Sequence, residues 1–148
     1  MSENKILIAD YDQQSLDVFS KMLKSQKYRL ITATDGQVAY EKFKAEKPDL
    51  VIIEAMLPKL HGFDLTKKIA QESEGRVPVI IVTGLYRGPQ FKDEAVSKLG
   101  AVEFLEKPVD PDKLLKKVKE FFQEDEDLSG DLPGSDELME LLEKSLQR

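Results

Sequence analysis

Short apolar runs recur five times along the chain, and they are rich in β-branched residues. Runs of this kind favour strands that are buried on both faces, as in a parallel sheet. Between them lie segments in which apolar residues share one helical face, which predicts amphipathic helices. The helical stripes are Leu16, Phe19 and Leu23, then Ala39 and Phe43, and last Leu114, Val118 and Phe121. The apolar runs are Ile6–Ala9, Tyr28–Thr32, Leu50–Ile53, Val79–Val82 and Ala101–Leu105.

The alternation of predicted strands and helices indicates right-handed βαβ units, which place their strands side by side in a parallel sheet. Five such strands predict an α/β fold of the (βα)5 kind with helices on both faces of the sheet. Local signals support this spacing. Gly100 marks a turn, and Asp110–Pro111 combines a good helix N-cap with a proline at the first helical position.

Composition excludes several classes of site. The 148 residues include no cysteine, so disulfides and thiolate-bound metals are excluded. The single histidine, His61, cannot build a multi-histidine metal centre, and we expect it to be exposed in a loop. No apolar run approaches the roughly 18 residues of a membrane-spanning helix, and the N-terminus lacks the apolar core of a secretion signal. We therefore expect a cytoplasmic protein that does not enter a membrane.

Negative charge is concentrated at the C-terminal end. Residues 124–148 hold nine acidic and two basic residues, whereas residues 1–123 hold 19 acidic and 20 basic ones. A body with a net charge of only +1 gives no reason to expect nucleic-acid binding. The acidic run and the glycines and proline after it predict a linker over residues 124–134, which follows a domain over residues 1–123.

Residues 135–148 predict a short amphipathic helix that begins at Ser135. A helix of about three turns is marginally stable alone in water. We therefore expect it to dock on the body, on a second copy or on a partner, or else to fray. Self-association would use the apolar positions Leu138, Leu141 and Leu142.

Polar and charged residues stand where the predicted strands end. Asp10 and Asp12 follow the first run, and Glu54 follows the third. Thr83 and Lys107 stand at the ends of the fourth and fifth. The carboxyl ends of parallel strands meet at one edge of the sheet, where open α/β folds bind their ligands. We therefore expect these acids, the hydroxyl and the ammonium to surround one pocket.

With these strand ends in this order, residues 5–122 resemble the receiver domain of two-component response regulators. The resemblance implies a flavodoxin-like, doubly wound fold with a five-stranded sheet in the order 2-1-3-4-5. Working receivers take a phosphoryl group from a histidine kinase onto an aspartate after the third strand, and an acidic pair after the first strand helps to bind Mg²⁺. The matching stretches are ILIADYD, DLVIIEAMLPKLHGFDL, VPVIIVTG and LGAVEFLEKPVD.

The resemblance also implies roles for single residues. Glu54 occupies the position of the phosphoacceptor, and Thr83 and Lys107 occupy those of the residues that contact phosphoryl oxygens. Phe104 matches an aromatic residue that reorients in the active state, although it lacks the hydroxyl often found there. The Lys107–Pro108 peptide bond is often cis in this family, a conformation that proline makes accessible.

Two departures from the family pattern decide the predicted function. Glu54 replaces the phosphorylated aspartate, and Tyr11 replaces the acidic residue that usually binds the metal directly. Mg²⁺ needs accurately placed oxygen ligands, and phosphoryl transfer depends on positioning, so that a shift of about one ångström costs about a hundredfold in rate. With Asp10 and Asp12 left, we expect no bound metal, no phosphorylation and no enzymatic activity.

Two hypotheses remain for Glu54. Its longer side chain can reach toward the position of the phosphoryl oxygens, pair with Lys107 and accept a hydrogen bond from Thr83, which would favour an active-like state without phosphorylation. Alternatively, Glu54 and Lys107 merely balance each other's charge in a relic pocket.

We therefore predict a phosphorylation-deficient receiver that acts by binding proteins, through the face of the fourth helix, fifth strand and fifth helix that this family uses for docking. One alternative is a working phosphoacceptor that binds Mg²⁺ through Asp10, Asp12 and Glu54. A second is a flavin- or nucleotide-binding module of the same fold, although the strand ends lack a glycine-rich phosphate loop. The loop over residues 85–90 is longer than is common in the family, which we interpret as a surface variation.

Overall fold

The computed structural model describes residues 4–122 of the 148-residue chain. The described residues divide into two units, one that ends at Pro111 and one that begins at Asp112. The linker predicted at 124–134 and the helix predicted at 135–148, with Leu138, Leu141 and Leu142, lie outside the described residues. Within the described residues, every helix is too short or too polar to cross a membrane.

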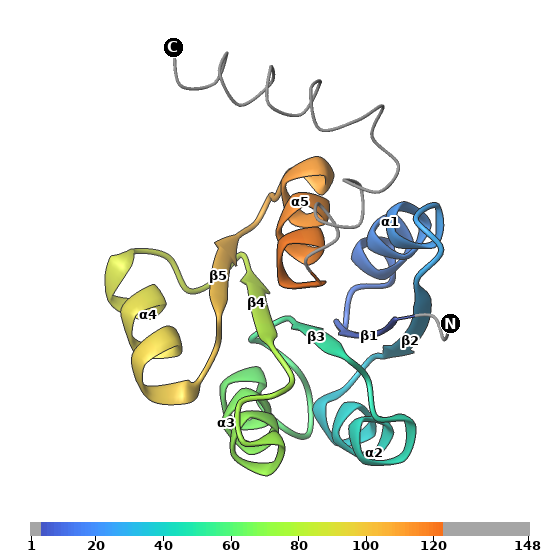
Figure 1. The fold of residues 1–148 in the computed structure, drawn as a ribbon. Coiled ribbons are helices and arrows are strands. Elements are labelled where there is room, and N and C mark those ends of the chain that lie inside the picture. The colour runs from blue at the N-terminus through green and yellow to red at the C-terminus, as the bar shows by residue number, and fades with distance from the viewer. Residues whose placement is uncertain (1–3, 123–148) are drawn as a thin grey trace, which may run out of the picture. The chain divides into compact units, whose positions relative to one another are not determined.

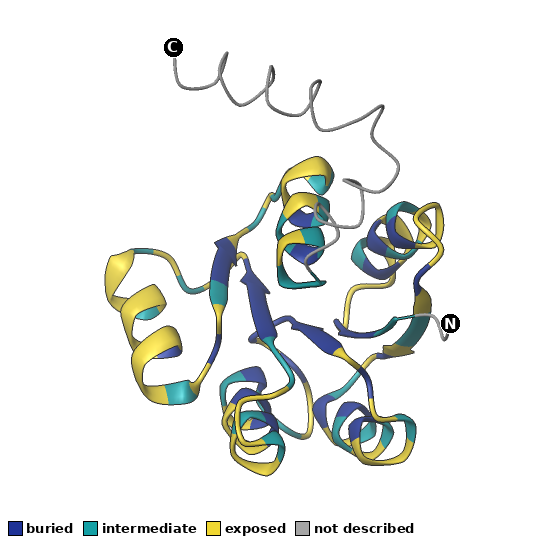
Figure 2. Ribbon diagram, in the orientation of Figure 1, coloured by how far each residue is buried: buried dark blue, intermediate teal, exposed yellow. Residues whose placement is uncertain are grey.

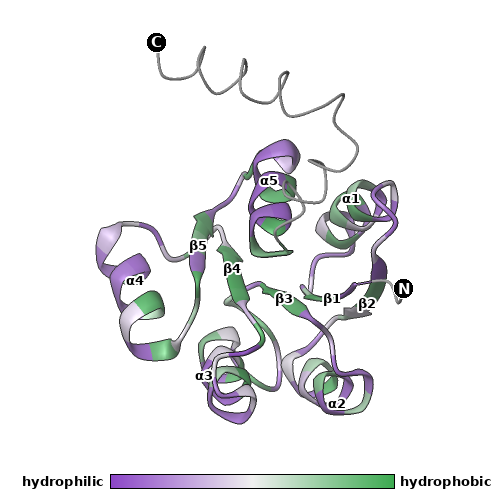
Figure 3. Cartoon of the chain, in the orientation of Figure 1, coloured by the Kyte–Doolittle hydropathy of each residue, from purple (hydrophilic) through white to green (hydrophobic). Residues whose placement is uncertain are grey.

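A single five-stranded parallel sheet forms the centre of the first unit, in the order β2-β1-β3-β4-β5 (Figure 1). The predicted α/β fold and strand order are therefore confirmed. All residues of β3 and β4 are buried (Figure 2), and both strands are hydrophobic along their length (Figure 3), as expected of central strands in a parallel sheet. The strands are β1 (Lys5–Ala9), β2 (Arg29–Ala33), β3 (Leu50–Ile53), β4 (Val79–Thr83) and β5 (Glu103–Glu106).

Helices cover both faces of the sheet. On one face lies α1, and on the opposite face lie α2 and α3 (Figure 1). The predicted stripe of Leu16, Phe19 and Leu23 is the buried side of α1, and Asp12 caps that helix. The helices of the first unit are α1 (Gln13–Lys24), α2 (Gly36–Glu46), α3 (Gly62–Ser73) and α4 (Pro89–Glu94), which continues into the π-helical turn η1 (Ala95–Leu99). The last described helix, α5 (Pro111–Phe122), begins at the predicted proline.

Two parts of the fold differ from the sequence prediction. The fifth strand begins at Glu103, two residues later than predicted, because Ala101 and Val102 form the turn that follows η1. The fourth helix gave no apolar stripe in the sequence because none of its residues is buried. Its continuation η1 contributes only Ala95 to the buried set.

Candidate functional site

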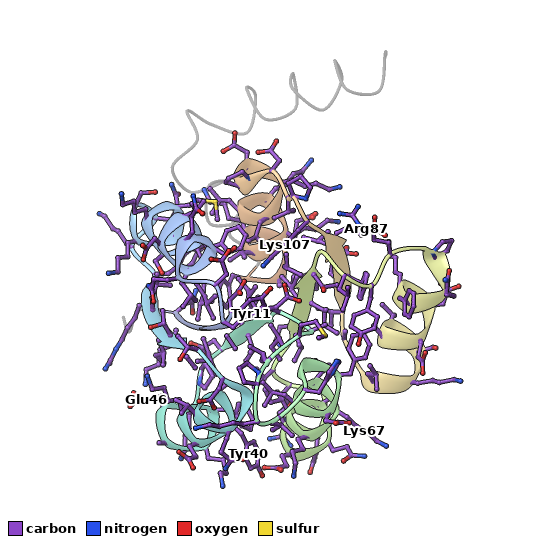
Figure 4. All side chains as sticks on the ribbon, turned by 180° about the vertical axis from the view of Figure 1, so that it is seen from behind. Tyr11, Tyr40, Glu46, Lys67, Arg87 and Lys107 are labelled. Atoms are coloured by element: carbon purple, nitrogen blue, oxygen red, sulfur yellow. The ribbon has the colours of Figure 1, made fainter. Side chains whose placement is uncertain are left out.

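Main-chain hydrogen bonds just beyond the strand ends bring the predicted site residues together. The N–H of Glu54 donates to the carbonyl of Ala9 at 2.9 Å, and the N–H of Lys107 donates to the carbonyl of Thr83 at 2.8 Å. These bonds extend the strand pairing of β3 with β1 and of β5 with β4 by one residue. Figure 4 shows Lys107 and Tyr11 near this edge of the sheet.

The ammonium group of Lys107 bridges two buried carboxylates. Its Nζ lies 2.8 Å from Oδ2 of Asp10 and 2.9 Å from Oε1 of Glu54. The two acidic residues are only 3% and 4% exposed, respectively. A weaker third bond runs from Nζ to Oγ of Ser15 at 3.4 Å. One positive charge is therefore shared by two negative charges that have little contact with water.

This arrangement raises the pKa of both Asp10 and Lys107. Burial raises the pKa of Asp10 above its usual 3.8, and the nearby negative charge of Glu54 adds to this, although the hydrogen bond from Lys107 opposes it. Burial alone would lower the pKa of Lys107, but its hydrogen bonds to Asp10 and Glu54 outweigh burial and raise that pKa above 10.5. The ammonium form of Lys107 is thus strongly preferred in the folded protein.

The other carboxylate oxygens accept main-chain hydrogen bonds. Oδ1 of Asp10 accepts from the N–H of Asp12 at 2.9 Å, and Oε2 of Glu54 accepts from the N–H of Met56 at 3.1 Å. The predicted pocket acid Asp12 instead caps α1, where its oxygens accept from the Gln14 N–H and the Ser15 hydroxyl. The side chain that replaces the second acid, Tyr11, is 57% exposed.

Thr83 and Phe104, which occupy the positions of a phosphoryl-contacting hydroxyl and a reorienting aromatic residue, lie in separate environments. Thr83 is fully buried, and its Oγ1 accepts a hydrogen bond from the N–H of Leu85 at 3.3 Å. Within the described part of the chain, no hydrogen bond joins Thr83 to Glu54. Phe104 is 4% exposed and belongs to the core cluster on the face covered by α2 and α3. The Lys107–Pro108 peptide bond is cis.

The hydrogen bonds that hold the β4–α4 loop, made by Arg87 and Glu106, were not predicted from the sequence. Arg87 donates from Nη2 to the carbonyl of Lys107 at 2.7 Å and from Nε to the carbonyl of Gly84 at 3.2 Å. Oε2 of Glu106 accepts from the N–H of Gly88 at 2.9 Å. The long loop interpreted as a surface variation is therefore attached to the end of β5, through contacts that join residues about 20 positions apart.

Contacts between His61 and Tyr86 of the β4–α4 loop correct the prediction that His61 is exposed. The residue is half-buried, because its ring packs against Phe63 and Tyr86, with centroids 5.0 and 5.8 Å away. Its Nδ1 accepts from the N–H of Phe63 and so caps α3. Its Nε2 lies 3.2 Å from the hydroxyl of Tyr86. Among the described residues, no group of three or more histidine, cysteine or acidic side chains is arranged to hold a metal ion.

Comparison with known proteins agrees with this fold. The profile of the response regulator receiver domain matches residues 6–119. The alkaline phosphatase synthesis transcriptional regulatory protein PhoP of Bacillus subtilis is 31% identical over 82% of this chain and 50% of its own length. A CheY-like receiver domain protein from Methanospirillum hungatei has a TM-score of 0.76 and 30% identity, over 85% of this chain and 98% of its own.

A relative named for a different function also matches most of this chain. The 3',5'-cyclic-nucleotide phosphodiesterase regA of Dictyostelium discoideum is 30% identical over 82% of this chain but only 16% of its own length. The chain spans about half the length of the first curated relatives that it matches.

Proposed function

Because this chain belongs to the response regulator receiver domain family, we propose that it is a signalling receiver that has lost phosphorylation and acts by binding other proteins. The observation that carries the proposal is the Lys107 bridge. The carboxylate at the phosphoacceptor position, Glu54, has one oxygen on Lys107 Nζ and the other on the Met56 N–H. Both oxygens of Glu54 are therefore hydrogen-bonded, which adds to the argument that its longer side chain is poorly placed to attack a phosphoryl group.

The donor set also suits Mg²⁺ poorly. A magnesium ion binds oxygen at about 2.0–2.1 Å and needs near-octahedral geometry. In this pocket a positive ammonium group already contacts both Asp10 and Glu54, while Asp12 caps α1. Tyr11 offers a neutral phenol in place of the missing acid. We infer that the protein neither binds Mg²⁺ here nor catalyses phosphoryl transfer or its hydrolysis.

Protein binding is the remaining way for such a domain to signal, and we place the partner on the side of α4, η1 and β5. This side includes the edge strand of the sheet and two exposed apolar residues, Val96 and Val102. Exposed apolar side chains near an edge strand favour contact with another protein.

Intact-mass spectrometry after incubation with Mg²⁺ and acetyl phosphate tests the proposal. We expect no phosphoryl adduct on the unmodified protein. The matched control is the double variant Glu54→Asp with Tyr11→Asp, in which we expect an adduct to form at least partly. A stoichiometric adduct on the unmodified protein would show instead that it is a working phosphoacceptor.

A further inference from the structure

Exposed apolar side chains gather at the mouth of the pocket above the Lys107 bridge. Among the described residues, six large hydrophobic side chains are exposed, and three of them line this one pocket: Tyr11, Met56 and Leu85. Their exposed fractions are 57%, 39% and 61%. They come from the loops after β1, β3 and β4, so three separate segments contribute to one apolar rim.

The hollow below this rim is large enough for a side chain. The pocket has a volume of about 310 Å³, and Glu54 and Lys107 line it together with the rim. An adjoining cavity of about 480 Å³ shares Asp12, Gly84 and Lys107 with it and is lined by Val18 and Phe19 of α1. A concave surface with an apolar rim is typical of a site that another molecule covers.

Charge indicates what fits this surface. The carboxylates of Asp12 and Glu54 line the pocket, and Lys107 supplies the one positive charge of the lining, which it shares with the buried Asp10. The other cation of the neighbourhood, Arg87, lies 4.0 Å from Glu106 and donates to main-chain carbonyls. The pocket is therefore negative, and a group that enters it is favoured when it is positive.

We propose that the rim of Tyr11, Met56 and Leu85 is a docking surface for a partner protein that inserts an arginine or lysine flanked by apolar residues. The cation would approach the carboxylate side of the pocket, and the aromatic ring of Tyr11 attracts cations as well. The flanking apolar residues would cover the rim, with arginine and tyrosine as the anchors that such interfaces favour. The inference rests on the proposed loss of the metal site, because a bound Mg²⁺ would supply the missing charge.

The test titrates the isotope-labelled full chain with the peptide N-acetyl-Leu-Arg-Leu-amide and follows main-chain amide signals by NMR. Matched peptides carry Gln or Glu in place of Arg. We expect saturable shifts at Asp12, Met56 and Gly84, and binding of the Arg peptide about tenfold or more tighter than that of the Glu peptide. Because the attraction is electrostatic, the Arg peptide should bind more weakly as salt is added.

Single variants locate the site. Tyr11→Ala and Leu85→Ala, both at exposed positions, should each lower the affinity for the Arg peptide by about fivefold or more. The control Gln26→Ala changes an exposed residue in the turn between α1 and β2, at the opposite ends of the strands from the pocket, and should leave binding of the Arg peptide unchanged. Equal affinity for the three peptides, no saturable shift, or shifts that survive both rim variants would each overturn the proposal.

A separate titration with MgCl₂ distinguishes the two ideas. Saturable Mg²⁺-dependent shifts at Asp10 and Glu54, together with a phosphoryl adduct in the mass experiment, would defeat the proposed function. Peptide results that fail while Mg²⁺ leaves the pocket unchanged would defeat only the docking surface.

Discussion

Arg87 and Lys107 are joined by a hydrogen bond of 2.7 Å from the guanidinium Nη2 to the main-chain carbonyl, across 20 positions of sequence. The same arginine donates to Gly84, the residue that follows β4. The β4–α4 loop is therefore tied to the residue whose ammonium bridges Asp10 and Glu54. A change in the pocket at Lys107 can therefore reach the β4–α4 loop through Arg87.

Replacement of Arg87 by alanine should loosen this loop. The variant loses two hydrogen bonds from a charged donor, but the side chain is 57% exposed, so we expect a loss of only about 1 kcal/mol in the free energy of unfolding. Amide hydrogen exchange over residues 85–91 should become faster. Arg76→Ala is the control, since the Arg76 side chain is 80% exposed and pairs with Glu74, which is itself 73% exposed. Unchanged hydrogen exchange in the loop would contradict the claim that the hydrogen bonds of Arg87 hold it in place.

Replacement of Lys107 by methionine should be the most damaging change in the pocket. It leaves two buried carboxylates facing each other, so we expect a loss of about 3 kcal/mol near neutral pH, measured by urea denaturation. The loss should shrink in acid, where protonation of a carboxylate relieves the repulsion. Lys92→Met serves as the control. Its ammonium lies 3.6 Å from Glu103 and the Lys92 side chain is 56% exposed, which predicts a loss of about 0.5 kcal/mol.

Asp10 should make stability depend on pH. Because burial raises its pKa above 3.8, the folded protein holds this proton to higher pH than the unfolded chain does. The free energy of unfolding then falls as the pH rises through the interval between the two pKa values. Asp10→Asn removes the group that titrates. The free energy of unfolding of the variant, relative to that of the wild type, should therefore be higher at about pH 7 than at about pH 4. A difference in the free energy of unfolding between the variant and the wild type that is the same at about pH 4 and about pH 7 would contradict this prediction.

Most of the fold follows from local patterns, and the exceptions have identifiable causes. Central strands such as Leu50–Ile53 are visible as apolar runs because both of their faces are buried. The stripe on α1 is visible because one face of that helix is buried. The fourth helix buries nothing, so no periodicity marks it. Where burial does not constrain the residue type, the sequence carries no signal of the element.

The site was predictable only as far as topology determines it. Strand ends of a parallel sheet meet, which is why Glu54 and Lys107 lie together. The partner of Thr83, by contrast, depends on the path of the β4–α4 loop, whose anchors Arg87 and Glu106 have no local pattern. Side-chain contacts that depend on the path of a loop, such as that of Arg87 with Lys107, cannot be read from spacing along one chain.

The role of Glu54 can be decided by replacing it with glutamine. The structure favours simple charge balance, because Thr83 donates no hydrogen bond to Glu54 within the described residues and accepts one from Leu85 instead. Glu54→Gln should therefore shift amide signals around Met56 and Lys107 but leave those of η1 and Phe104 in place. Shifts that reach η1 and Phe104 would support the alternative, in which Glu54 holds an active-like state.

His61 should stabilise the fold through two separable contacts. Its Nδ1 accepts from the N–H of Phe63 and caps α3, and its Nε2 meets the hydroxyl of Tyr86. His61→Ala removes both contacts and should cost about 1–2 kcal/mol in the free energy of unfolding, measured by urea denaturation. His61→Asn keeps a good N-cap and loses only the link to Tyr86, so it should cost less. Equal losses in the two variants would show that the cap contributes nothing and that the contact with Tyr86 carries the effect.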